Sequence, residues 1–247
     1  MEPFALPLST PWWQTIFGAG LFAKIDMLVL FIFSVISWTI SLRKLFLFRA
    51  IQRENRILLN LFQHRRSAMQ FQKAVGDYKK SPLAKILGCG IREWESLKKQ
   101  SGMSNPTTTM VTNSPSVNTA VLSQLLPNIS ESMNRTGSVE LERTERFLPF
   151  LATISSVSPF LGLLGTVWGV LAALLNVRNI PIITLQVIAP GVSDALVTTV
   201  AGLLVAIPAL MFYNYFVGKL KDLSSETERF ISEILGDFRK EILFTKD

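Results

Sequence analysis

The sequence predicts an all-α integral membrane protein with three transmembrane helices that extend into the cytoplasm and assemble as a ring-forming homo-oligomer. Hydrophobic residues make up 49% of the 247 residues, charged residues only 17%, and the mean hydropathy is +0.34. Soluble domains carry about 25% charged residues. Three stretches, at 21–42, 147–177 and 185–217, are apolar and long enough to cross a bilayer, which takes about 20 residues.

The first span, 21–42, reads "LFAKIDMLVLFIFSVISWTISL". Lys24 and Asp26 lie near its start, and the rest of the span is uncharged. No Lys or Arg precedes Lys24, and no small-residue cleavage site follows the apolar stretch, so we expect a retained anchor and not a cleaved signal peptide. The segment 1–20 is then expected to be extracytoplasmic.

A polar region, 43–146, follows the first span. Its first part, "RKLFLFRAIQRENRILLNLFQHRRSAMQ", has the apolar spacing of an amphipathic helix, which predicts that the first helix continues into the cytoplasm. A second helix is predicted over "PLAKILGCGIREWESLKKQ", and the Ser/Thr/Asn/Pro-rich stretch 100–127 is predicted to be a flexible loop. In "SVELERTERFLPF", which begins at Ser138, Glu142 and Arg146 are four residues apart, so a helix is expected to run into the second span.

The second span, 147–177, contains no charged residue. Gly162, Gly165 and Gly169 recur at three- and four-residue spacing, which allows close approach of helices in lipid, and Pro159 lacks a backbone donor that neighbours must compensate. We therefore assign these four residues to helix packing. The Thr166 hydroxyl can bond to its own backbone or face a pore or a partner, and both interpretations stay open.

The third span, 185–217, follows the short extracytoplasmic loop 178–184 and contains one formal charge, Asp194. A charge at such a depth costs about 2.5 kcal/mol or more, so it is expected to face protein or an aqueous path. At about 100° per residue, Thr198 shares the face of Asp194, whereas Thr199 lies roughly 140° away. Polar groups on two faces predict assembly with neighbouring subunits.

The distribution of Lys and Arg predicts the orientation. Of the 25 basic residues, 17 lie in 43–146 and six in the predicted C-terminal helix 218–247, while Lys24 and Arg178 are the other two. Because basic loops stay in the cytoplasm, the N-terminus is expected in the periplasm and the C-terminus in the cytoplasm of a multi-pass inner-membrane protein. The net charge of +7 is then a consequence of membrane orientation and does not indicate nucleic-acid binding.

Residues for enzyme chemistry are scarce. The single histidine, His64, and the single cysteine, Cys89, lie on different predicted cytoplasmic segments, which supports neither a metal site nor a Cys/His couple. No GxxxxGK[ST] phosphate-binding loop occurs. The sequence therefore predicts no enzyme and no cofactor, and any mechanical work must be driven by another energy source.

The two motifs "SPFLGLLGTVWGVLAAL" and "APGVSDALVTTVAGLLVAIPALMFYN" resemble the MotA/TolQ/ExbB proton channel family, and most closely its TolQ and ExbB members. The resemblance covers the first span and residues 139–247, and it is weak over 75–137. It implies a homopentameric ring around the helices of a TolR- or ExbD-like single-span protein, in which proton flow drives a TolA- or TonB-like protein. The short helical tail favours TolQ over ExbB.

The resemblance also implies roles for individual residues. Thr166 matches the threonine of the family's "GTVWG" motif and Thr199 the threonine of its last span, and both are expected to line a proton path together with Asp194. Asp194 takes the place of the family's usual glutamate and is one methylene shorter, and Thr198 replaces a usual alanine.

A second hypothesis belongs to another class. The chain would be a non-conducting membrane scaffold that anchors envelope or secretion proteins, and Asp194 would only satisfy hydroxyl or amide groups of a neighbour. The sequence leaves the coupling ion, the process served and the role of residues 75–137 open.

Overall fold

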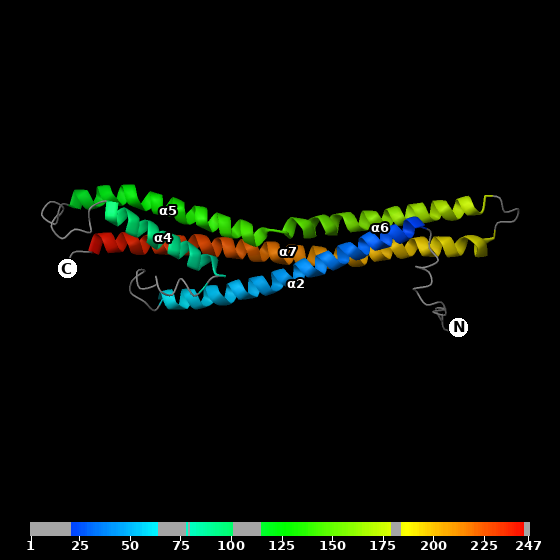
Figure 1. The fold of residues 1–247 in the computed structure, drawn as a ribbon, viewed down its shortest axis with the longest axis horizontal. Coiled ribbons are helices and arrows are strands. Elements are labelled where there is room, and N and C mark those ends of the chain that lie inside the picture. Colours follow the sequence, from blue (N-terminus) through cyan, green and yellow to red (C-terminus); the bar gives the residue numbers. More distant parts are fainter. Residues whose placement is uncertain (1–20, 64–77, 79, 101–114, 179–183, 245–247) are drawn as a thin grey trace, which may run out of the picture. The chain divides into compact units, whose positions relative to one another are not determined.

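The computed structural model describes residues 21–63, 78, 80–100, 115–178 and 184–244. The regular elements in these ranges are all α-helices, which are shown in Figure 1: α2 (Leu21–Gln63), α4 (Pro82–Gln100), α5 (Pro115–Glu145), α6 (Leu148–Asn176) and α7 (Leu185–Phe244). Three helical stretches are long and apolar enough to cross a membrane, and they contain the predicted spans 21–42 and 185–217 and all but the last residue of 147–177. The all-α class is therefore as predicted. The predicted N-terminal segment and most of the 178–184 loop lie outside the described residues.

The chain divides into two compact units. The described residues within 1–43 and 147–216 form the unit that we call the apolar unit, and those within 44–146 and 217–247 form the amphipathic unit. The chain passes from one unit to the other within one residue of the ends that the sequence suggests for the spans. Both α2 and α7 contribute to each unit.

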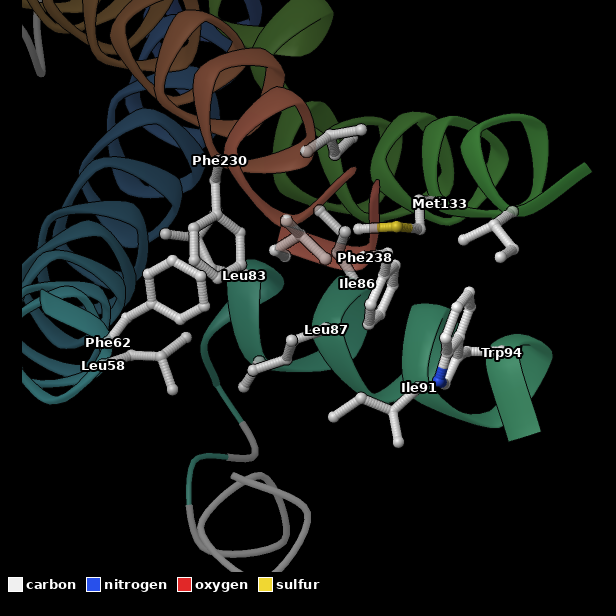
Figure 2. Close-up of a cluster of buried hydrophobic side chains, with 14 residues drawn as sticks. Leu58, Phe62, Leu83, Ile86, Leu87, Ile91, Trp94, Met133, Phe230 and Phe238 are labelled. Atoms are coloured by element: carbon white, nitrogen blue, oxygen red, sulfur yellow. The ribbon is translucent and has the colours of Figure 1, made fainter. Parts of the chain in front are cut away.

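The amphipathic unit has a hydrophobic core to which α2, α4, α5 and α7 all contribute (Figure 2). Trp94 of α4 stacks on Phe238 of α7 with ring centroids 5.0 Å apart, and Phe62 of α2 meets the edge of Phe230 at 5.4 Å. The last part of the apolar stripe that the sequence shows in 43–63, with Leu58 and Phe62, thus packs into this core.

The start of α4 is fixed by a cap and by contacts with two other helices. The Ser81 hydroxyl accepts a hydrogen bond from the Ala84 amide at 3.2 Å, as an N-cap residue does, and Pro82 occupies the first helical position. The same hydroxyl donates to Asn55 Oδ1 of α2 at 2.6 Å, and Asn55 Nδ2 donates to Glu226 of α7 at 3.0 Å. This buried polar chain sets the position of α4 between α2 and α7.

Helix α5 differs from the prediction at both ends. It begins at Pro115, so the predicted loop 100–127 is wrong for its second half, and Ser138 lies inside this helix and not at its start. Proline is favourable at a first helical position, where its missing amide hydrogen costs nothing. Residues 101–114 lie outside the described part of the chain.

Helix α5 also does not continue into the second span. Phe147 adopts a left-handed φ of 73° between α5 and α6, and α6 carries Pro149 in its first turn. In an uninterrupted helix the ring of Pro149 would clash with the carbonyl of Glu145, which is the last residue of α5. The proline that the sequence places inside the expected helix therefore separates two helices.

The core of the amphipathic unit gives a stability prediction. Leu58 is fully buried, whereas its neighbour Ile57 is 38% exposed. We expect Leu58→Ala to lower the free energy of unfolding of this unit by about 2–5 kcal/mol and Ile57→Ala by less than about 1 kcal/mol. Cys89, the single cysteine, is half-buried in α4, so its rate of reaction with a thiol reagent in increasing urea reports the unfolding. Equal midpoints for the two variants would contradict the packing in Figure 2.

Candidate functional site

Helices α6 and α7 approach so closely in the apolar unit that their backbones touch. A Cβ atom placed on Gly162 would lie 2.7 Å from the Thr198 carbonyl oxygen and 3.0 Å from the Thr199 Cα. On the other helix, a Cβ atom on Gly202 would lie 2.6 Å from the Ser158 carbonyl oxygen. Only glycine fits at these two positions while the helices keep this separation.

The contact continues toward the far end of α6. A Cβ atom on Gly169 would lie 2.7 Å from the Cβ of Ala195, and one on Gly191 would lie 2.7 Å from the Cβ of Ala173. The partners on α7 come earlier in the chain as those on α6 come later, so the two helices are antiparallel. We call this contact the glycine seam: Gly162, Gly165 and Gly169 on α6, and Gly191 and Gly202 on α7. Pro159 is half-buried beside it, one residue after the fully buried Ser158.

Two threonine hydroxyls meet across the seam. Thr166 Oγ1 and Thr199 Oγ1 are hydrogen-bonded to each other. Thr166 Oγ1 also lies 3.0 Å from the carbonyl oxygen of Gly162, on its own helix, and 3.2 Å from that of Ala195 on α7. Thr199 Oγ1 lies 3.1 Å from the Gly162 carbonyl oxygen. The Thr166 hydroxyl thus bonds to its own backbone, as the first interpretation expects, and also to a second helix of the same chain, whereas a pore-facing or partner-facing role stays a prediction.

A third hydroxyl completes what we call the threonine cluster, Thr166, Thr198 and Thr199. Thr198 is 2% exposed, and its Oγ1 lies 2.7 Å from the Ala195 carbonyl oxygen and 3.1 Å from that of Gly162. Each hydroxyl carries one hydrogen and can donate to one acceptor at a time. Since each of the three hydroxyls has at least two acceptors within hydrogen-bond distance, the cluster has more than one hydrogen-bond arrangement.

Asp194 lies outside this network. It is half-buried, and among the described residues it forms neither a hydrogen bond nor an ion pair. Its neighbour Ala195 packs in the seam, and no contact of the glycine seam involves Asp194 itself. The structure thus brings Thr166 and Thr199 together but does not join Asp194 to them.

A second acid, Asp26, reaches the site from α2. It is only 5% exposed, and its Oδ2 has no hydrogen-bond partner. A Cβ atom on Gly165 would lie 2.6 Å from Asp26 Oδ2 and also 2.6 Å from Thr198 Oγ1, so the carboxyl group is beside the threonine cluster. One turn before Asp26, Phe22 stacks on Trp168 of α6 with ring centroids 4.7 Å apart, which places α2 along α6 here.

From the sequence, Asp26 was recognised only as a charge near the start of the first span. A signal was present in the spacing of polar residues along α2. Asp26, Ser37 and Ser41 recur at helical spacing, and all three are buried on one side of this helix. A polar stripe on an otherwise apolar span indicates a face that packs against protein, and this pattern was missed.

The site has the composition of a small polar cluster within an apolar unit. The three hydroxyls and two backbone carbonyls can exchange hydrogen-bond partners, and the carboxyl group can also bind a proton. Among the described residues there is no group of three or more His, Cys, Asp and Glu residues that could hold a metal ion.

Comparison with known proteins places this arrangement in a family. The sequence model of the MotA/TolQ/ExbB proton channel family matches residues 102–229, just over half of the chain. The Tol-Pal system protein TolQ of Haemophilus influenzae is 29% identical over 217 residues, which cover 87% of this chain and 88% of that protein. The Tol-Pal system protein TolQ of Pseudomonas aeruginosa is 28% identical over 253 residues and the full length of both chains.

The biopolymer transport protein ExbB of Pseudomonas putida is 27% identical over 223 residues, which cover 90% of this chain and 62% of that protein. The matched region of the family model includes all of α6 and the part of α7 that carries the seam, the threonine cluster and Asp194. The chain with this glycine seam therefore belongs to the MotA/TolQ/ExbB proton channel family.

Proposed function

We propose that the chain is the inner-membrane proton-channel and stator subunit of a Tol-Pal or TonB type motor, in which the proton motive force drives a TolA- or TonB-like protein. The observation that carries this proposal is the threonine cluster inside an apolar unit, with Asp194 beside it. The similarity to the TolQ and ExbB proteins supports the same role.

The surface of the apolar unit supports assembly. Large apolar side chains are exposed on all three of its helices, for example Phe31 on α2, Phe160 on α6 and Leu204 on α7. In a membrane these side chains contact lipid or neighbouring subunits. In our proposal, copies of the chain form a ring, a homopentamer, around the helices of a TolR- or ExbD-like single-span protein. The N-terminus is periplasmic and the C-terminus cytoplasmic, as the distribution of basic residues indicates.

Within the proposed ring, Asp194 is a proton-responsive group or a fixed negative charge, and it lies on the face that contacts a partner helix. Its carboxyl group has no partner among the described residues of its own chain, so a group from another chain or water is expected to satisfy it. Thr166 and Thr199 supply hydroxyls that both donate and accept, as a route for protons requires. Each charge that crosses the membrane provides about 2.3 kcal/mol per 100 mV.

One observation favours the second candidate, a non-conducting scaffold. The three hydroxyls of the threonine cluster all have backbone carbonyls of the same chain within hydrogen-bond distance, so they can serve helix packing alone. The two functions differ in what a shape-conserving substitution does, because a scaffold tolerates the loss of a titratable group that a motor requires.

We expect Asp194→Asn to abolish motor-dependent envelope function while the protein still inserts and assembles, because the amide keeps the shape but neither ionises nor binds a proton. We expect Asp194→Glu, the residue usual in the family, to keep at least part of the function. Complementation of a strain that lacks the gene, scored by survival in detergent, measures both variants, and native mass spectrometry measures assembly. An active Asn variant would support the scaffold, and an inactive Glu variant would mean that the site requires the shorter acid.

We expect Thr166→Val and Thr199→Val each to abolish the same function with normal protein levels. Valine keeps the approximate shape, and the loss of one interhelical hydrogen bond costs only about 0.6–1.7 kcal/mol in a membrane, too little to prevent folding. The matched control is Thr153→Val, since the exposed Thr153 hydroxyl of α6 bonds only to the Pro149 carbonyl of its own helix, at 3.0 Å. If both cluster variants protect cells as well as the control does, the cluster serves packing only.

A further inference from the structure

The structure contains a second acid inside the apolar unit, and we propose that Asp26 is a proton-binding group of each subunit that acts through the Thr198 hydroxyl. This inference rests on the proposed motor function and adds a residue to its proton-handling site. It is carried by a carboxyl group that is buried, has no partner and lies beside the threonine cluster.

The position of Asp26 is defined by contacts from two other helices. Asp26 Oδ2 and Thr198 Oγ1 both lie 2.6 Å from the point that a Cβ of Gly165 would occupy. The absence of a side chain at Gly165 thus leaves the two oxygens beside the same small space. The Cβ of an alanine at position 165 would clash with both oxygens.

The environment of Asp26 supplies no compensating charge. From the other helices, Gly165 of α6 and Thr198 of α7 lie beside its carboxyl group, and neither ionises. On its own helix the nearest charged group is Lys24, which is exposed, and Asp26 forms no ion pair with any described residue. On α7 the nearest acid is Asp194, one turn before Thr198. A buried carboxylate without a partner is costly in a membrane, whereas a bound proton removes the charge.

The space beside Gly165 fits a proton better than a metal ion. The same Cβ position would lie 2.8 Å from the Thr198 Cβ, closer than carbon atoms approach without bonding, so no further heavy atom fits there. A proton on Asp26 needs no additional volume. The exchange forms or breaks one O–H bond on the carboxyl group, the proton goes to or comes from water, and no electron is transferred.

The protonation state of Asp26 changes which hydrogen bonds Thr198 makes. When Asp26 is protonated, its O–H donates to Thr198 Oγ1, and Thr198 donates to the Ala195 carbonyl at 2.7 Å. When Asp26 is ionised, the Thr198 hydroxyl turns to the carboxylate, and the Ala195 carbonyl becomes available to Thr166, whose Oγ1 lies 3.2 Å away. The protonation state of Asp26 thereby affects the hydrogen bond between Thr166 and Thr199.

The first test compares Asp26→Asn with Asp194→Asn in the full-length protein, expressed in a strain that lacks the gene. An asparagine donates a hydrogen bond as a neutral aspartic acid does, so a purely structural Asp26 predicts full function. We expect Asp26→Asn to lower survival in detergent at least about tenfold, with normal membrane insertion and assembly. Full function of Asp26→Asn beside an inactive Asp194→Asn would overturn this inference alone, whereas full function of both would overturn the proposed motor.

The second test does not depend on motor function and remains decisive where Asp26→Asn folds poorly. The infrared band of protonated carboxyl groups is followed against pH in the purified protein and in two threonine variants. We expect one buried carboxyl to titrate with a midpoint that changes in Thr198→Val and stays the same in Thr39→Val, since the exposed Thr39 hydroxyl bonds only to Val35 of its own helix. An identical titration in both variants would show that Thr198 does not interact with a titrating acid and would overturn the inference.

Discussion

The direct contact between the backbones of α6 and α7 is the constraint on which the apolar unit depends. In lipid the hydrophobic effect does not hold helices together, so close packing and interhelical hydrogen bonds must do so. Gly162 and Gly202 remove the side chains that would keep the backbones apart. Close approach then brings the Gly162 carbonyl within reach of hydroxyls from the other helix, as its 3.1 Å distances to Thr198 and Thr199 show. The glycines and threonines therefore act together: the glycines allow the two helices to approach closely, and the threonine hydroxyls can then bond from one helix to the other.

The same contact explains why polar groups are tolerated inside an apolar unit. Thr166 and Thr199 each bond to the other and to backbone carbonyls, so their hydroxyls are satisfied without water. The two acids are not satisfied in this way, because Asp26 Oδ2 has no partner and Asp194 forms no hydrogen bond or ion pair among the described residues. Buried polar groups normally have hydrogen-bond partners. We therefore expect Asp26 and Asp194 to bind protons, or to be bound by a ligand or another chain.

The sequence predicted the helices better than their contacts. Long apolar runs and the amphipathic stripe of 43–63 identify α2, α6 and α7, because these signals are local. The start of α5 at Pro115 was missed because the Ser, Thr and Asn residues that precede and follow it favour loops only weakly. Asp26 was missed for a different reason, since its burial results from packing against Gly165 and Thr198, which are more than a hundred residues away in the chain.

The choice of acceptors in the threonine cluster distinguishes a static packing contact from a site that can respond to a proton. Each of the three hydroxyls carries one hydrogen but has at least two acceptors within hydrogen-bond distance, among them the carbonyl oxygens of Gly162 and Ala195. One interhelical hydrogen bond would suffice for packing. A cluster in which each hydroxyl has a second acceptor within reach can instead rearrange at little cost when a nearby carboxyl group gains or loses charge. Thr198, the one hydroxyl that faces both an acid and these carbonyls, is therefore the residue through which charge and helix packing are coupled in this subunit.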